Sequence, residues 1–163
     1  MPPEGVVRLD PVPLENKAAL RAFLEPYLIA HADLVDPERR FGDPTVDEFF
    51  DLYWIEPERT PYWVIADGQP KGFVLVNAWS PSGQGTERAI AEFYIRPELR
   101  RRGLGQAAAL AAFATHPGLW ELQVYRANPL GMAFWPRAIE AAGARDWQRL
   151  EHEDRVIHRF RTD

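Results

Sequence analysis

The chain of 163 residues contains no cysteine. This absence excludes disulfide bonds, thiolate metal ligands and a cysteine nucleophile. No apolar run approaches the roughly 20 residues of a membrane-spanning helix, so we expect no membrane association. Residues 1–5 lack the charge and the apolar segment of a secretion signal, and we therefore expect a cytoplasmic protein. The four histidines are not spaced as metal ligands, so no metal site is predicted.

Positive charge is scarce in the first half of the chain. Residues 1–80 carry 14 Asp and Glu against 7 Lys and Arg, a net −7, whereas residues 81–163 carry 10 against 12, a net +2. The overall net charge of −5 argues against a nucleic-acid-binding protein. Anion binding is expected in the second half, and the acidic first half favours a cationic ligand.

The hydrophobic patterns predict a single domain over residues 1–163, without linker or repeat. Asp67-Gly68 predicts a tight hairpin turn, and Pro136 predicts a kink or a broken turn in the last helix. The order of elements, β-α-α-β-β-β-α-β-α-β-β, indicates an α+β fold, an α/β sandwich built on a mixed sheet. The expected strands are 6–9, 60–66, 72–79, 90–95, 119–125, 147–150 and 155–161, and the expected helices are 14–30, one from 45, one after 103, and 128–143.

The stretch from Ile90 to Phe113 is the most informative part of the sequence. It predicts a strand, an arginine-rich loop with two glycines, and an alanine-rich helix. Backbone N–H groups at a helix N-terminus have no intrahelical acceptor, and the helix dipole favours negative charge there. The stretch therefore indicates an anion-binding loop.

Three anionic ligands suit such a loop. Gly103-x-Gly105-x-x-Ala108 fits the dinucleotide fingerprint, but residues 96–102 separate the strand from the glycines and no acidic residue ends a second strand at the required spacing. A P-loop is excluded because no Gly-Lys-Ser/Thr follows. The third ligand is the pyrophosphate of coenzyme A, and a dinucleotide stays the weaker alternative.

Two correctly spaced motifs favour the third ligand. Residues 95–105, Ile-Arg-Pro-Glu-Leu-Arg-Arg-Arg-Gly-Leu-Gly, resemble motif A of the GNAT superfamily of N-acetyltransferases. Residues 128–135, Asn-Pro-Leu-Gly-Met-Ala-Phe-Trp, resemble its Asn-x-x-Ala-x-x-Phe-Tyr segment. The chain is also similar to a little-characterised bacterial branch of predicted acetyltransferases. The resemblance implies a mostly antiparallel sheet with helices on both faces, and an acyltransferase that uses acetyl-CoA.

The resemblance also implies where the coenzyme binds. Backbone amides of the arginine–glycine loop would hold the pyrophosphate, and the pantetheine arm would lie along residues 93–95, where family members have a bulge that separates this strand from the next. An N–H near Tyr94 or Ile95 would face the acetyl oxygen. A solvated arginine run and a purely helix-capping Asn128 are the alternatives. The expected coenzyme-binding residues are Phe93, Tyr94, Ile95, Arg100, Arg101, Arg102, Gly103, Leu104, Gly105, Gln106, Asn128, Phe134 and Trp135.

Glu92 is the candidate general base because it interrupts an otherwise apolar strand beside the expected cleft. Its alternative role is a structural carboxylate paired with an arginine. Trp135 stands where many relatives have a tyrosine that protonates the leaving thiolate, and an indole N–H is not an acid at neutral pH. That duty falls to Tyr125, Tyr94, water or no group, so the predicted catalytic residues are Glu92 and Tyr125.

We therefore expect an acetyl-CoA-dependent N-acetyltransferase that acts by direct attack of an amine, more plausibly a small-molecule amine than a protein tail. A cationic amine is favoured by the acidic first half. The alternative is a catalytically weak acyl-CoA-binding sensor, which Trp135 favours. Neither nucleic acid nor membrane is expected as a partner, and the chain suits a monomer or a homodimer.

Overall fold

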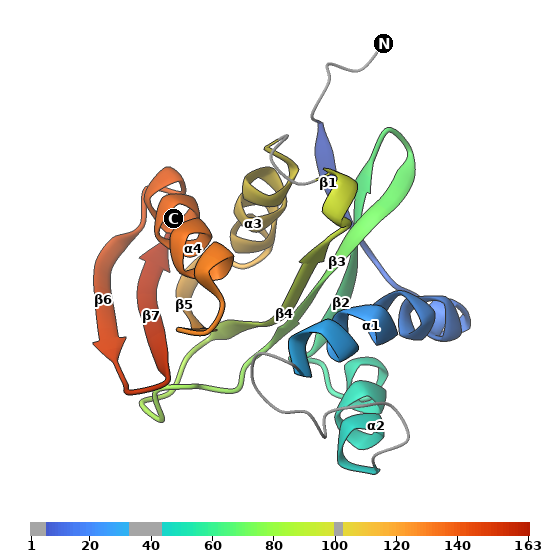
Figure 1. Ribbon diagram of the computed structural model, residues 1–163, viewed down its shortest axis with the longest axis horizontal. Coiled ribbons are helices and arrows are strands. Elements are labelled where there is room, and N and C mark those ends of the chain that lie inside the picture. Colours follow the sequence, from blue (N-terminus) through green and yellow to red (C-terminus); the bar gives the residue numbers. More distant parts are fainter. Residues whose placement is uncertain (1–5, 33–43, 100–102) are drawn as a thin grey trace.

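The computed structural model describes residues 6–32, 44–99 and 103–163. One seven-stranded sheet runs in the order β1-β2-β3-β4-β5-β7-β6 (Figure 1). Its neighbouring strands are antiparallel, except that β4 and β5 are parallel. The strands are β1 (Val7–Pro11), β2 (Thr60–Ala66), β3 (Gln69–Asn77), β4 (Arg88–Ile95), β5 (Gly118–Tyr125), β6 (Arg145–Glu151) and β7 (Arg155–Thr162). The α-helices are α1 (Lys17–Ala32), α2 (Pro44–Asp51), α3 (Leu104–Thr115) and α4 (Pro129–Ala141), and a short 3-10 helix, η2 (Leu52–Trp54), follows α2.

The predicted order of elements and the α+β class are confirmed. Asp67 and Gly68 both have positive φ, as a tight hairpin turn requires, and they join β2 to β3 as expected. The broken turn expected at Pro136 does not occur, because α4 is continuous through this residue. Packing of its neighbours in the core compensates for the missing N–H. Most of the loop expected between the first two helices lies outside the described residues.

The two faces of the sheet bury separate clusters, because side chains alternate along each central strand. On β3, Phe73 and Leu75 join the cluster under α1 and α2, whereas Val74 and Val76 join the cluster under α3 and α4. Helices therefore cover both faces. From α1, side chains at helical spacing complete the first cluster: Leu20, Leu24 and Leu28.

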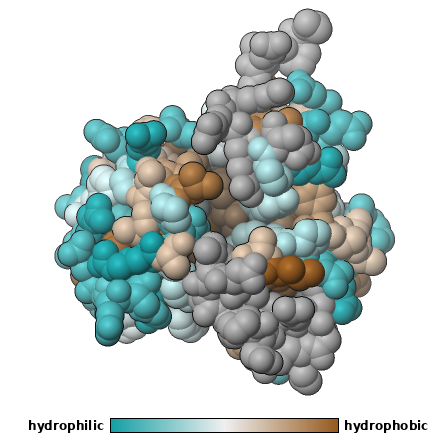
Figure 2. All heavy atoms as spheres, viewed as in Figure 1, coloured by the Kyte–Doolittle hydropathy of each residue, from teal (hydrophilic) through white to brown (hydrophobic). Residues whose placement is uncertain are grey.

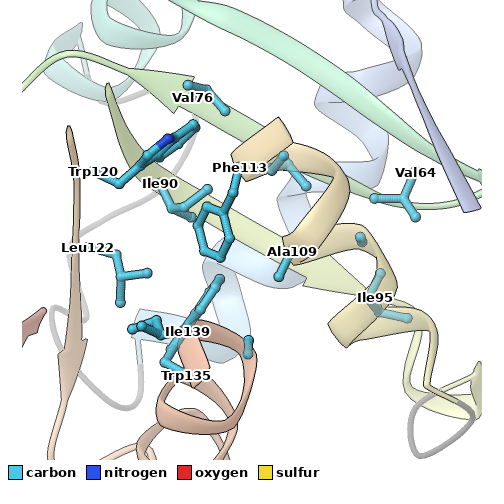
Figure 3. Close-up of a cluster of buried hydrophobic side chains, with 14 of the residues drawn as sticks. Val64, Val76, Ile90, Ile95, Ala109, Phe113, Trp120, Leu122, Trp135 and Ile139 are labelled. Atoms are coloured by element: carbon cyan, nitrogen blue, oxygen red, sulfur yellow. The ribbon is translucent and has the colours of Figure 1, made fainter. Parts of the chain in front are cut away.

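The helix α3 lies close to the sheet because its inward positions are small. Ala108, Ala109 and Ala112 are fully buried, and Phe113 fills the space at the end of the helix. Figure 3 shows Ala109 and Phe113 facing side chains of β4, β5 and α4. Core residues pack at the density of organic crystals, so larger side chains at these alanines would push α3 away from the sheet.

A buried histidine should make the stability of this fold depend on pH. His158 on β7 is 1% exposed, and Trp147 Nε1 donates a hydrogen bond to its Nδ1 at 3.0 Å. Burial lowers the pKa of His158 to about 4, and the positive charge of Arg149 acts in the same direction. The unfolded chain binds the proton more readily than the folded chain, so His158 favours folding above pH 6.5.

We expect the free energy of unfolding to fall as the pH drops from 6.5 towards 4. The slope should be about 1.4 kcal/mol per pH unit, and the total loss about 3 kcal/mol. His158→Asn keeps an acceptor for Trp147 but cannot titrate, so it should be less stable at pH 7 and lose this part of the pH dependence. Urea unfolding of both proteins at several pH values measures the difference. Parallel pH curves would contradict the assignment.

Candidate active site

The sheet opens between β4 and β5. Their parallel pairing is limited to Arg88 with Trp120, Ala89 with Glu121, and Ile90 with Leu122. Beyond Ile90, β4 continues in register with β3 as far as Ile95, while β5 pairs with β7 along its whole length. Beyond Ile90, β4 thus stays paired with β3 and β5 stays paired with β7, while β4 and β5 are no longer paired with each other. Figure 2 shows this face of the molecule hollowed between the side of α3 and α4 and the side of α1.

A β-bulge lies at the point of separation. Leu75 of β3 is opposite Glu92, but the next residue, Val76, is opposite Ile90, so Ala91 is an extra residue in β4. A bulge bends its strand and redirects the side chains on either side of it. Here Ile90 packs under α3 and α4, whereas Glu92 contacts α1.

Glu92 is buried on the α1 side of the sheet. Its side chain is 8% exposed, and the hydroxyl of Tyr27 donates a hydrogen bond of 2.6 Å to its Oε2. The phenol of Tyr53 is close as well. Burial is the main factor that raises the pKa of Tyr53 well above its usual value; the negative charge of Glu92 acts in the same direction and Arg59 opposes it. Asn77 Nδ2 donates to the Tyr53 hydroxyl at 3.5 Å.

The hydroxyl of Tyr27 thus contacts the carboxylate that the sequence singled out, and the phenol of Tyr53, which Asn77 contacts, interacts with it electrostatically. The sequence pattern did not identify Tyr27 as a site residue, because it lies in the apolar stripe of its helix. Tyr53 follows apolar residues of the second helix, a pattern more typical of helix core than of a ligand site. No local signal in the sequence indicates that these side chains meet a residue of β4, since 65 positions separate Tyr27 from Glu92.

The first turn of α3 faces the same opening from the other side of the sheet. Gly103 caps the helix in the left-handed conformation, with φ 76° and ψ 0°. A Cβ added at Gly105 would lie 3.2 Å from Phe134 Cε2 and 4.0 Å from Ile95 Cγ1. Gly105 therefore lets α3 pack closely against Phe134 of α4, whereas a Cβ at Gly103 would meet no atom within 4 Å, so the main chain is open to a phosphate group at Gly103. Arg100, Arg101 and Arg102 lie outside the described residues.

Aromatic side chains fill the space between β4 and α4. Phe93 has its ring centroid 5.5 Å from that of Phe134 and 5.0 Å from that of Trp135. The last two rings meet edge to face at 4.8 Å. Trp135 is 7% exposed and belongs to the core under α3 and α4 (Figure 3). These contacts are those of a packing residue.

The other predicted residues take different positions. Asn128 Oδ1 accepts a hydrogen bond from the backbone N–H of Gly131 at 3.0 Å, which confirms the helix cap expected there. Tyr125 ends β5, and by alternation it lies on the face opposite Val124, away from α4. Tyr94 joins the cluster under α1 and α2. A contact of Asn128 or Tyr125 with a ligand stays a prediction.

Among the described residues, no cluster of three or more histidine, aspartate or glutamate side chains is arranged to hold a metal ion. Within the same residues, no helix is both long and apolar enough to span a membrane.

A second buried carboxylate, Glu121, lies on β5 next to the opening. Glu121 is fully buried on the strand position that pairs with Ala89, one residue before the end of the parallel pairing. Ser80 Oγ donates to its two oxygens at 3.1 Å, and the N–H and hydroxyl of Ser82 donate at 2.9 and 2.8 Å. Arg159 of β7 forms an ion pair with it. The carboxylate thus holds the β3–β4 loop, β5 and β7 together.

Glu121→Gln should lower the free energy of unfolding by about 2–4 kcal/mol, because the mostly buried Arg159 would lose its counter-charge. Glu151→Gln removes an exposed charge from β6 and should change stability by less than about 0.5 kcal/mol. Urea unfolding at pH 7 measures both variants. A loss in Glu121→Gln no larger than in Glu151→Gln would show that this network does not stabilise the fold.

The sequence from residue 26 to residue 138, more than half of the chain, matches the family model described as Acetyltransferase (GNAT) family. The chain therefore belongs to the GNAT acetyltransferase family, which confirms the resemblance found in its motifs. It is an acetyltransferase, and acetyl-CoA is its co-substrate. No curated protein sequence matches the chain significantly.

Solved structures share the fold along almost the whole chain. An acetyltransferase from Thermus thermophilus is 18% identical with a TM-score of 0.69, and the alignment covers 97% of each chain. The aminoglycoside acetyltransferase AAC(6')-Ib, solved with coenzyme A and kanamycin, is 16% identical with a TM-score of 0.65 and coverage of 96% and 95%. The PaiA N-acetyltransferase from Thermoplasma acidophilum, solved with coenzyme A, is 13% identical with a TM-score of 0.60 and coverage of 96% and 99%. At these identities the likeness concerns the fold.

Proposed function

We propose that the protein transfers the acetyl group of acetyl-CoA to the amine of a small molecule, with Glu92 as the general base. One observation carries the proposal. The bulge at Ala91 leaves a buried carboxylate at the point where β4 and β5 separate, in contact with Tyr27 of α1. A base must lie within hydrogen-bond reach of the proton that it removes, and the opening gives an extended substrate access to Glu92.

The chain offers matching groups for the coenzyme. The first turn of α3, with Gly103, Gly105 and Gln106, would hold the pyrophosphate through its N–H groups. The edge of β4 from Phe93 to Ile95 would bind the pantetheine arm as an added strand, because the ladder to β5 has ended there. The arginines at 100–102 would add positive charge.

The reaction requires no covalent intermediate on the enzyme. The amine nitrogen forms a bond to the acetyl carbon, the carbon–sulfur bond breaks, and the electron pair leaves with the thiolate. Glu92 accepts the proton that the amine loses, directly or through water. Positioning of the two reactants contributes about 7–11 kcal/mol, and a general base contributes about 10²- to 10⁴-fold in rate. Trp135 supplies no proton, so Tyr125, Tyr94 or water would protonate the thiolate, or the thiolate would leave unprotonated.

The α1 side of Glu92 suits a cationic amine. The rings of Phe23, Tyr27 and Tyr94 lie together over Phe73, with centroids 5.5–6.2 Å apart. Aromatic faces attract ammonium groups, and the negative charge of Glu92 adds to this attraction. The net charge of residues 1–80 is also negative. That AAC(6')-Ib, with the same fold, was solved with kanamycin supports a small-molecule acceptor.

Thiol release from acetyl-CoA over a panel of amines tests the activity, and Glu92→Gln tests its mechanism. The variant should lower kcat by about 10²- to 10⁴-fold, because the amide cannot accept the proton, while the dissociation constant of coenzyme A stays unchanged. Glu140→Gln, an exposed carboxylate of α4, is the matched control and should keep full activity. A Glu92→Gln variant with normal kcat would make Glu92 a structural residue. Coenzyme binding by the wild type without turnover of any amine would favour an acyl-CoA sensor, the function that the buried Trp135 also permits.

Gly105→Asp tests the coenzyme site. The new carboxylate would extend towards Phe134 from the first turn of α3, where it would repel a pyrophosphate and press on the ring. We expect calorimetry to show at least a 100-fold loss of coenzyme A affinity, on the order of 3 kcal/mol. Gln148→Glu adds the same charge on the exposed surface of β6 and should bind normally. Unchanged affinity in Gly105→Asp would exclude this loop as the coenzyme site.

A further inference from the structure

Tyr27 is a close polar neighbour of the proposed base. Its hydroxyl donates a hydrogen bond of 2.6 Å to Glu92 Oε2. Tyr27 comes from α1, an element that shares no backbone pairing with β4. The contact therefore joins the helix beside the proposed acceptor site to the strand that carries Glu92.

The tyrosine itself is held in place on several sides. Its ring meets Phe73 edge to face, with centroids 5.5 Å apart and an interplanar angle of 85°. It also meets Tyr94 at 5.7 Å and 55°. Leu24 and Leu28, on either side of Tyr27 in sequence, anchor α1 in the core. A ring with two χ angles and these neighbours has little freedom, so its hydroxyl marks a fixed point above β4.

Glu92 needs such a fixed point. Ala91 interrupts the register on its N-terminal side, and a glutamate side chain has three rotatable bonds. Displacement of a catalytic carboxylate by about 1 Å can lower the reaction rate by about 100-fold. Tyr53 interacts electrostatically with Glu92; a tyrosine hydroxyl is protonated at neutral pH, and burial and the charge of Glu92 raise its pKa further. A protonated phenol donates a hydrogen bond but cannot take the place of Glu92 as the base.

We propose that Tyr27 is a positioning residue for the reaction, which orients the carboxylate of Glu92 towards the amine through the hydroxyl hydrogen bond. This inference rests on the proposed role of Glu92. It makes α1 part of the catalytic apparatus and not only a wall of the acceptor site. Movement of α1 would then change the rate at constant coenzyme affinity.

A double-mutant cycle of Tyr27→Phe and Glu92→Gln tests the inference. Phenylalanine keeps the ring contacts with Phe73 and Tyr94 and removes the hydroxyl donor. We expect kcat to fall by about 10- to 100-fold, with the KM for acetyl-CoA unchanged. In the Glu92→Gln background, Tyr27→Phe should cause no further loss, because the group that it orients is already inactive. Each variant is assayed with the amine that shows the highest turnover in the panel. Acetyl-CoA hydrolysis, in which water is the acceptor, is measured for comparison.

Tyr62→Phe is the matched control. Tyr62 lies on β2 and packs against the cluster under α3 and α4, on the other face of the sheet, so its variant should keep full activity. Thermal unfolding of Tyr27→Phe checks that the fold is intact. Normal kcat in Tyr27→Phe, or an equal loss in both backgrounds, would overturn the positioning role and leave Glu92 as the base. Normal kcat in Glu92→Gln alone would instead overturn the proposed function, and this inference with it.

Discussion

The site depends on where the hydrogen bonding between β4 and β5 stops. The two strands share three residue pairs and then separate, because β5 stays paired with β7 and β4 stays paired with β3. The extra residue Ala91 falls where this separation begins, and a bulge increases the local twist of its strand. Glu121 holds the last shared pairs in place through the β3–β4 loop and Arg159. Ending the hydrogen bonding between two strands inside a sheet is unfavourable, and these contacts fix the residue at which β4 and β5 separate.

The two faces of the opening differ in chemistry. On the face of α3 and α4, small residues and the rings of Phe93, Phe134 and Trp135 give dense packing, and helix geometry leaves free N–H groups at the first turn of α3. On the face of α1 and α2, the Tyr27 hydroxyl contacts Glu92, whose charge also acts on the Tyr53 phenol. The bulge puts Ala91 and Glu92 on the same face, towards α1, while Ile90 and Phe93 on either side of them face α3 and α4. One short strand thus presents side chains to both faces of the opening.

The sequence predicted what depends on local patterns and family motifs. The order of elements, the turn at Asp67-Gly68 and the cap at Asn128 follow from periodicity and from the preferences of single residues, and the structure confirms them. Contacts between distant residues could not be predicted in this way. Tyr27 fits the apolar stripe of its helix, and Glu121 is a single charged residue in a strand. Neither pattern indicates the distant residue that the side chain contacts, Glu92 or Arg159. The continuity of α4 through Pro136 also depends on tertiary packing, which overrides the local preference.

Trp135 limits the proton transfers that α4 could assist. A buried indole on α4 can fill space but cannot protonate a thiolate. A thiolate is a stable enough anion to leave without a proton, whereas an ammonium cannot attack until it has lost one. Removal of the amine proton is then the step that most needs help from the protein. With the role proposed for Glu92, selection for rate would act on this carboxylate and on Tyr27, which α1 and β4 bring together.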